Sequence, residues 1–145
     1  MLDASMAASD DADIFIGAAA VVDFRPESVA TQKIKREGST TMDLRLVSNP
    51  DIIASIAARQ ARPSLVVGFA AETNDVTTYA RDKLKKKRLD FIFANDVSDS
   101  AIGFNSDSNA GTLISADNDI TMALSSKRVL AETMIAELAK HLPET

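Results

Sequence analysis

The chain has 145 residues, a formal net charge of −5 and no cysteine, with 46% hydrophobic and 26% charged residues. These values predict one globular domain over residues 1–145 and exclude disulfide bonds and cysteine-ligated metal. No apolar run approaches the roughly 20 residues that span a bilayer, and the acidic balance opposes binding to nucleic acid or to an anionic membrane. We therefore expect a cytoplasmic protein with neither kind of partner.

The first third of the chain begins with helix-like and strand-like segments and then turns polar. Residues 2–8 can form a helix, and the apolar run 13–17 predicts a short buried strand. Phe24-Arg25-Pro26 is expected to break this strand, because proline has no N–H to donate to a sheet. We interpret the polar residues 33–41 as a mobile loop and the alternating residues 42–46 as a half-exposed strand.

Asn49 and Pro50 predict the start of a helix over residues 51–60, because asparagine caps free N–H groups and proline at the first helical position needs none. Its buried side chains are expected to be Ile52, Ile53 and Ile56. Residues 64–70 predict a second buried strand.

The next segment predicts a helix that begins at Thr73 or Asn74 and ends near Lys87. Its core-facing side chains are expected to be Val76, Tyr79, Ala80 and Leu84. Residues 89–94 then predict a third apolar strand.

The end of the chain predicts a late hairpin, with strands at residues 112–115 and 120–122 around Asp117-Asn118. A final amphipathic helix, capped by Ser125 or Ser126, is expected to run through Leu142. Because strands alternate with helices, we predict a three-layer α/β/α, Rossmann-like domain with a mostly parallel sheet.

Small residues and clustered cations follow the predicted strand ends, where sheets of this kind bind ligands. The run from Gly17 to Asp23 allows close approach to the backbone, and Asp23 can accept hydrogen bonds from a base or a ribose. Lys33, Lys35 and Arg36 can close over a phosphate. The alternatives stay open: the alanines can simply pack under a helix, and the lysines can belong to a solvated loop.

Two further features can each be interpreted either as part of a ligand site or as ordinary structure. Asp51 follows Asn49-Pro50 where a helix start favours anions, but plain capping explains the same residues. Lys83 and Lys87 are four apart and share one helix face that can grip phosphates, whereas Lys85, Lys86 and Arg88 need only be a solvated surface. His141 is the only histidine, and we interpret it as a surface residue at a helix end.

Six sequence blocks carry a resemblance that covers nearly the whole chain. They are residues 17–26 (Gly-Ala-Ala-Ala-Val-Val-Asp-Phe-Arg-Pro), 33–36 (Lys-Ile-Lys-Arg), 46–52 (Leu-Val-Ser-Asn-Pro-Asp-Ile), 67–73 (Val-Gly-Phe-Ala-Ala-Glu-Thr), 94–98 (Ala-Asn-Asp-Val-Ser) and 103–107 (Gly-Phe-Asn-Ser-Asp). In this order they closely resemble the phosphopantothenoylcysteine synthetase domain. In its family, that of the DNA/pantothenate metabolism flavoproteins, this domain is often the C-terminal half of a bifunctional coenzyme A biosynthesis protein.

The resemblance implies a phosphopantothenate–cysteine ligase in coenzyme A biosynthesis. The bacterial family enzyme uses CTP and Mg²⁺ to activate the carboxylate of 4′-phosphopantothenate as an acyl cytidylate, and pyrophosphate leaves. The amine of cysteine then attacks, which gives 4′-phosphopantothenoylcysteine and CMP. The expected partners are these three substrates and a second copy of the chain in a homodimer, while the protein ligands of Mg²⁺ are unknown.

The resemblance also implies site residues. The nucleotide is expected against Gly17, Ala18, Ala19 and Asp23, against Pro50, Asp51, Ile52 and Ile53, and with its base near Phe69. The catalytic lysines are expected to be Lys33, in a flap that closes on the intermediate, and Lys35. Lys83 and Lys87 are expected to bind the triphosphate, where cations stabilise the departing pyrophosphate.

The chain departs from the family pattern at its start. No glycine-rich strand–loop–helix segment precedes Asp13, and the flavin-binding decarboxylase half, which would hold FMN, is also absent from these residues. We therefore expect the chain to carry most of the CTP site without part of the catalytic machinery. An inactive nucleotide-binding module is the alternative. Nucleic-acid binding is suggested only by residues 83–88 and by the word DNA in the family's name, and the acidity opposes it.

Overall fold

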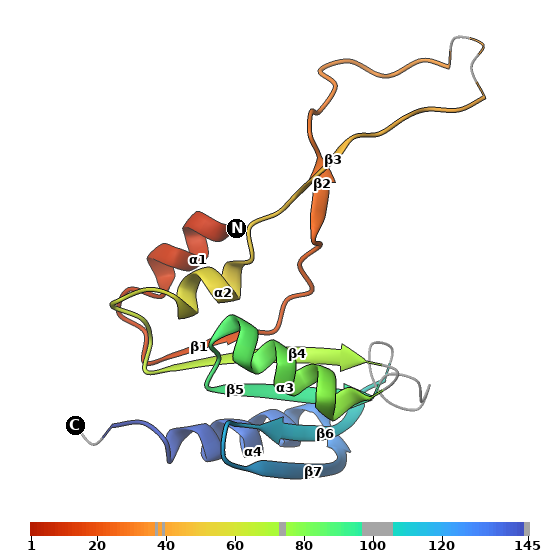
Figure 1. Ribbon diagram of the computed structural model, residues 1–145. Helices are drawn as coiled ribbons and strands as arrows, with labels where there is room; N and C mark the ends of the chain where they lie inside the picture. Colours follow the sequence, from red (N-terminus) through yellow and green to blue (C-terminus); the bar gives the residue numbers. More distant parts are fainter. Residues whose placement is uncertain (37, 39, 73–74, 97–105, 144–145) are drawn as a thin grey trace. The chain divides into compact units, whose positions relative to one another are not determined.

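The computed structural model describes residues 1–36, 38, 40–72, 75–96 and 106–143 (Figure 1). The chain divides into two compact units, of which one comprises residues 1–18 and 52–145 and the other residues 19–51. We call the first the sheet unit and the second the inserted unit, and each is described by itself.

The sheet unit is built on five strands in the order β1-β4-β5-β6-β7. Their bounds are β1 (Ile14–Gly17), β4 (Leu65–Glu72), β5 (Phe91–Asp96), β6 (Ser108–Ile114) and β7 (Asp119–Ser126). The first three run parallel, and the β6–β7 hairpin joins β5 antiparallel. This arrangement confirms the predicted parallel core and the late hairpin around Asp117-Asn118, although both hairpin strands are longer than predicted.

Helices cover both faces of this sheet, which confirms the three-layer prediction (Figure 1). Their bounds are α1 (Leu2–Ala8), α2 (Ile52–Ala57), α3 (Val76–Lys87) and α4 (Lys127–Ala139). Alternate strand residues face opposite ways, so Val66 packs with the core under α2 and α3 while Val67 packs with the core under α4. Each layer therefore has its own apolar core on the shared sheet.

Two helix predictions need correction. Tyr79 does not face the core, since it is 52% exposed while Ala80 and Leu84 are buried. α2 begins at Ile52 and ends at Ala57, well before residue 60, as the chain turns toward Pro63. The N-cap position of α3 is Asp75, and the predicted caps Thr73 and Asn74 lie outside the described residues.

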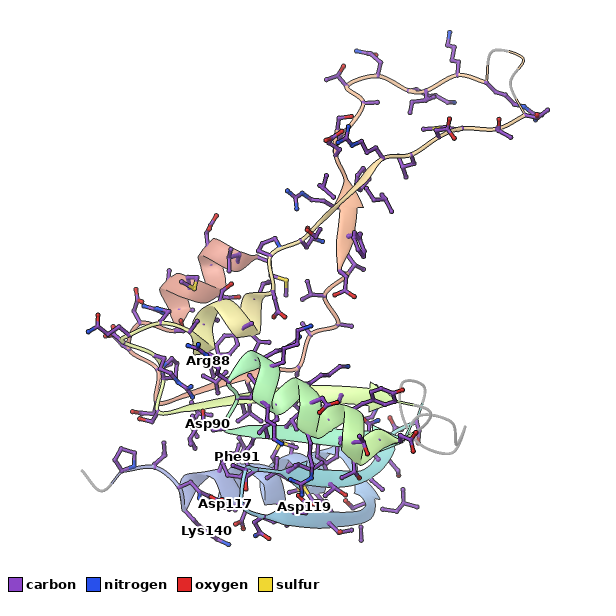
Figure 2. The ribbon with its side chains drawn as sticks, viewed as in Figure 1. Arg88, Asp90, Phe91, Asp117, Asp119 and Lys140 are labelled. Atoms are coloured by element: carbon purple, nitrogen blue, oxygen red, sulfur yellow. The ribbon has the colours of Figure 1, made fainter. Side chains whose placement is uncertain are left out.

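Arg62 ties together several elements at the amino ends of β4 and β5. Its guanidinium donates to the carbonyls of Arg88 (3.0 Å), Pro63 (3.3 Å) and Ala57 (3.5 Å), and it pairs with the carboxylate of Asp90. That carboxylate also accepts the Val66 N–H at 2.7 Å. Arg88 and Asp90 lie where α3 leads into β5 (Figure 2). This network holds the last turns of α2 and α3 to the start of the sheet.

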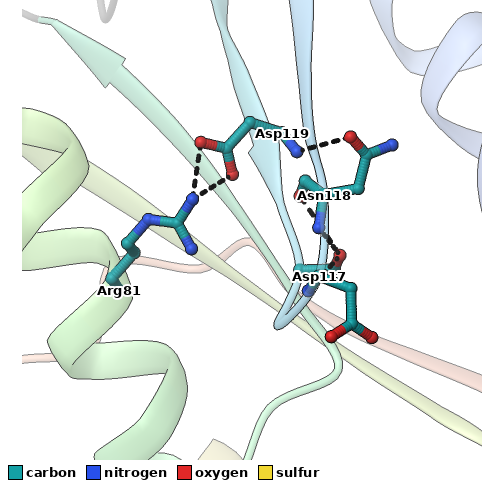
Figure 3. Close-up of polar contacts among 5 residues, drawn as sticks. Arg81, Asp117, Asn118 and Asp119 are labelled. Atoms are coloured by element: carbon teal, nitrogen blue, oxygen red, sulfur yellow. Dashed lines mark hydrogen bonds and ion pairs between the residues drawn. The ribbon is translucent and has the colours of Figure 1, made fainter.

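A second ion pair joins α3 to the hairpin. Arg81 donates to both carboxylate oxygens of Asp119 at 2.7 Å (Figure 3). The hairpin turn is closed by Ser115, whose hydroxyl accepts from the N–H of Asn118 at 3.0 Å and of Asp117 at 3.4 Å. One flank of α3 is thereby fixed to the start of β7.

Ser126 caps α4, as predicted, by accepting the Val129 N–H at 3.3 Å. The helix ends at Ala139 rather than at Leu142. His141 follows it as a half-exposed residue whose ring packs edge-on with that of Phe91, with the two centroids 5.0 Å apart. Lys140, which donates to Glu137 at 2.6 Å, lowers the pKa of that carboxyl.

The inserted unit contains a two-stranded antiparallel ribbon of β2 (Phe24–Pro26) and β3 (Leu46–Ser48). Two predictions are wrong here. Phe24-Arg25-Pro26 forms a strand, because both strands of a ribbon are edges and an edge tolerates proline. The strand expected over residues 42–46 begins only at Leu46, and Met42 and Leu44 are 63% and 57% exposed. The described residues between the two strands form no helix or strand, as expected for a loop.

We predict that Asp90→Ala lowers the free energy of unfolding by about 2–3 kcal/mol, because it removes an ion pair and leaves the Val66 N–H and part of Arg62 unpaired. Urea denaturation of the purified protein measures the loss. The matched control is Asp119→Ala, which removes a similarly exposed carboxylate that pairs with Arg81 alone and costs below about 1 kcal/mol. Equal losses in both variants contradict the proposed network.

Candidate functional site

The predicted site residues fall in both units. The sheet unit contains Gly17, Ala18, Ile52, Ile53, Phe69, Lys83 and Lys87, and the inserted unit contains Ala19, Asp23, Lys33, Lys35, Pro50 and Asp51. The structure brings together residues within each unit, as follows.

Gly17 and Gly68 form a gap that Ile53 fills. The two glycines are register partners at the carboxyl end of β1. A Cβ atom on Gly17 would lie 2.8 Å from Cδ1 of Ile53, and one on Gly68 would lie 3.4 Å from the same atom and 2.8 Å from Leu89. The lack of side chains therefore lets α2 pack closely on the sheet. Gly17 thus serves close packing, but the alternative that the alanines pack under a helix is wrong, because Ala18, Ala19 and Ala20 are all exposed.

Phe69 lies at the same edge of the sheet but on its other face. It directly follows Gly68, the last β4 residue that pairs with β1. Its ring packs on Phe93 with centroids 5.5 Å apart and planes at 55°, yet Phe69 stays 38% exposed. A ring held on one side and open on the other can pack against a planar base.

Lys83 and Lys87 both lie on α3, so the shared helix face is confirmed. Both are half-buried, whereas Lys85, Lys86 and Arg88 are exposed, as expected. Lys83 is about 200° around the helix from Arg81, so it lies on the flank away from the hairpin. α3 begins near the carboxyl edge and ends near the amino edge. Lys87, its last residue, is thus about 6 Å farther along the helix from Gly17 and Phe69 than Lys83 is.

In the inserted unit the structure brings Asp23 beside the Asn49-Pro50 motif. The Asn49 N–H donates to the Asp23 carbonyl at 2.7 Å, and the Asn49 side chain donates to the Val22 carbonyl at 2.8 Å. Asn49 is therefore not the predicted helix cap, since α2 begins three residues later and the Asn49 amide instead links the two sides of the ribbon. The sequence alone could not distinguish these roles, because both use the same donor and acceptor.

Lys33 and Lys35 lie in the segment between β2 and β3 and are exposed. Pro50 and Asp51 are also exposed. The two lysines are thus accessible to a phosphate, as their predicted role requires.

Asn95 belongs to the resemblance block 94–98 and stands out in the sequence at the end of an apolar strand, although no site role is predicted for it. It is a buried side chain near the carboxyl end of β5. It is 7% exposed, and its register partner on β4 is the small Ala71. Its position after an apolar strand was the available signal, since polar residues at that edge commonly meet ligands. The neighbouring block at residues 103–105 lies outside the described residues.

Two absences concern the described residues alone. Within ranges 1–36, 38, 40–72, 75–96 and 106–143, no three His, Asp or Glu side chains gather as a metal site. No helix in this part of the chain is long and apolar enough to cross a membrane.

The fold and these features define the class: a Rossmann-like α/β/α domain with small residues and an aromatic ring at the carboxyl edge of its parallel strands. Residues 1–142 match the model of the DNA/pantothenate metabolism flavoprotein C-terminal domain, and the chain belongs to this family.

The chain is similar to longer proteins. It is 48% identical over 139 residues to the coenzyme A biosynthesis bifunctional protein CoaBC of Vibrio parahaemolyticus, which covers 95% of this chain and 35% of that protein. It is 45% identical over 134 residues to the CoaBC of Escherichia coli, which covers 91% of this chain and 33% of that protein. The crystal structure of the C-terminal domain of a CoaBC matches with a TM-score of 0.72 and 28% identity, over 94% of this chain and 58% of that one. The chain thus spans about a third of the length of its curated relatives.

We predict that Gly17→Ala lowers the free energy of unfolding by about 1–2 kcal/mol, because the new methyl group overlaps Ile53. Ile53→Val removes Cδ1, the atom that meets the new Cβ. The double variant is therefore more stable than the sum of the two single losses, by about 0.5 kcal/mol or more. Denaturant unfolding of the four proteins gives this coupling, and strictly additive losses contradict the packing interpretation.

Proposed function

We propose that the chain is the ligase part of a coenzyme A biosynthesis protein and joins 4′-phosphopantothenate to cysteine at the expense of CTP. The observation that carries this proposal is the 45–48% identity to CoaBC proteins over more than nine-tenths of the chain. In the proposed reaction the carboxylate of the substrate attacks the α-phosphorus of CTP, and pyrophosphate leaves. The cysteine amine then displaces CMP from the acyl cytidylate, which forms the amide. A cytoplasmic location belongs to the same proposal.

The proposed residue roles are those that the family resemblance implies, and the charge and exposure of the residues are compatible with them. Lys33 and Lys35 are exposed cations that neutralise charge on the phosphates as the bond to pyrophosphate breaks. Ala18 and Ala19 leave the backbone open to the nucleotide, Asp23 accepts hydrogen bonds from it, and Phe69 packs on the base. Pro50, Asp51 and the backbone of Ile52 and Ile53 complete the nucleotide contacts.

Mg²⁺ enters this proposal with the nucleotide. Magnesium in such sites is held mainly by substrate phosphates and water with one or two carboxylates. A protein cluster of three ligands is therefore not required. Asp23 and Asp51 are the two carboxylates among the proposed nucleotide contacts, and they would hold the ion. When bound, the ion would supply positive charge that stabilises the departing pyrophosphate.

The alternative is a nucleotide-binding module without turnover. It is favoured by the share of its relatives that the chain spans, which is 35% and 33% of the two CoaBC proteins. Both hypotheses predict CTP binding by calorimetry, but only the ligase releases pyrophosphate when phosphopantothenate is added. A full-length polypeptide containing residues 1–145 that binds CTP and releases no pyrophosphate favours the module.

We predict that Lys83→Ala, in the full-length polypeptide, raises the KM for CTP about tenfold or more, because a half-buried cation that contacts phosphate contributes roughly 1.5–3 kcal/mol. Lys87→Ala has a smaller effect, since Lys87 lies at the end of α3 that is farther from the carboxyl edge. Pyrophosphate release measured against CTP concentration tests both. The matched controls are Lys85→Ala and Lys86→Ala on the same helix, which are exposed and leave KM within about twofold. Equal effects at all four positions contradict a specific phosphate contact.

We also propose that the chain forms a homodimer through the ribbon of the inserted unit. Phe24, Pro26 and Leu46 share one ribbon face, because Pro26 and Leu46 are register partners and Phe24 is two residues from Pro26. Phe24 is 58% exposed and Leu46 51% exposed. A two-stranded ribbon is only marginally stable alone in water, so an apolar partner surface would stabilise it.

Sedimentation equilibrium tests the dimer. We expect the mass of a dimer for the unmodified protein and that of a monomer for Phe24→Glu with Leu46→Glu, since two buried carboxylates oppose the contact. Leu124→Glu on β7 is the control, since Leu124 is 63% exposed but lies in the sheet unit. A monomeric unmodified protein rules the dimer out.

A further inference from the structure

We infer that Asn49 is a positioning residue that acts through Asp23: it holds the Asp23 segment in the conformation that receives the nucleotide. This inference rests on the proposed function, in which Asp23 touches the nucleotide. It goes beyond that function because Asn49 itself is given no contact with a substrate.

Asn49 uses its backbone and both ends of its side chain at once. Its N–H donates to the Asp23 carbonyl at 2.7 Å, and its Nδ2 donates to the Val22 carbonyl at 2.8 Å. Its Oδ1 accepts from Nη1 of Arg25 at 3.0 Å, and the same Nη1 donates to the Ser48 carbonyl at 3.0 Å. Four hydrogen bonds thus join residues 22–25 to residues 48–49.

These bonds extend the ribbon toward Asp23. The strand register ends with Phe24 opposite Ser48, so Asp23 and Val22 lie beyond the last paired residues. Asn49 supplies the next two donors, one from its backbone and one from its side chain. The backbone cannot continue the ladder further, because Pro50 has no N–H and keeps the residue before it extended. The Asn49 N–H is therefore the last backbone donor of this ladder before Pro50.

The chemistry selects asparagine at this position. An aspartate has the same size and still accepts from Arg25, but it has no donor for the Val22 carbonyl. An alanine loses both side-chain bonds. The flanking residues cannot compensate by packing, since Val22 is 69% exposed and Phe24 is 58% exposed. Without the Asn49 amide the Asp23 segment samples more conformations, and nucleotide binding must then order it.

The test compares Asn49→Asp with the unmodified full-length polypeptide. We expect the KM for CTP to rise about tenfold, with kcat changed less than twofold and a matching loss of CTP affinity in calorimetry. Arg25→Gln, which weakens the same bridge from the other strand, gives a second variant with the same direction of effect. The matched control is Arg45→Gln, which breaks the exposed 3.3 Å ion pair with Glu27 on the same ribbon and leaves KM within twofold.

A second arm separates positioning from general damage. In an Asp23→Ala background, Asn49→Asp is expected to cause no further loss of CTP affinity, because the residue it positions is gone. An unchanged KM and affinity for Asn49→Asp overturn the inference alone, as does an equal loss with and without Asp23. Failure of the unmodified protein to bind CTP overturns the proposed function and the inference with it.

Discussion

The close packing of Ile53 on two paired glycines fixes the position of α2 on the sheet, and the other features at this end of β1 depend on it. Gly17 and Gly68 have no side chain. Cδ1 of Ile53 therefore fills the space in which a Cβ atom at either position would crowd it. Dispersion contacts at this density are lost quickly when atoms move apart by even half an ångström. The contact therefore fixes the first turn of α2 over the carboxyl end of β1 and the middle of β4. The last residues of the Asn49–Ile53 motif are held in place by apolar packing rather than by their own polar groups.

The helix that carries the candidate phosphate-binding lysines is fixed from three directions. Its buried side chains Ala80 and Leu84 pack below it, and Arg81 pairs with Asp119 on one flank. At its C-terminal end the guanidinium of Arg62 donates a hydrogen bond to the Arg88 carbonyl. Arg88 itself adopts a left-handed conformation with φ of 57°, where glycine is the usual residue. The N–H of Leu89 donates to the Leu84 carbonyl at 2.9 Å. This hydrogen bond closes the helix end and offsets the energetic cost of the left-handed conformation at Arg88. A cation on a helix held this firmly loses little freedom when it meets an anion, so Lys83 is well suited to an electrostatic role.

The sequence predicts the sheet unit well because its signals are local and apolar. The helix over residues 2–8, the hairpin turn and the Ser126 cap each follow from a few neighbouring residues, and all three are confirmed. The failures lie where one residue type serves two geometries. Asn49 has the donor and acceptor of a helix cap, yet it links two strands, and Phe24-Arg25-Pro26 reads as a break but pairs as an edge strand. Tyr79 fits the helical stripe but points outward, because Val76, Ala80 and Leu84 already cover the sheet. In each case the outcome depends on contacts with residues far away in the chain, and these contacts cannot be inferred from a single sequence.

The two units are stabilised by different forces, and this difference bears on how the proposed site works. The sheet unit has apolar cores on both faces, whereas no described residue of range 19–51 is buried. The geometry of the inserted unit therefore depends on hydrogen bonds that compete with water, each of which contributes only about 0.5–1.5 kcal/mol. A segment held so weakly exchanges between conformations, and a ligand shifts it by its preference for one of them. Lys33 and Lys35 are exposed and lie outside any helix or strand, so in the proposed function contacts with the phosphates would hold them when the nucleotide is bound. The Asn49 hydrogen bonds limit that freedom at Asp23, which in the proposed function keeps this contact in place while Lys33 and Lys35 move onto the phosphates.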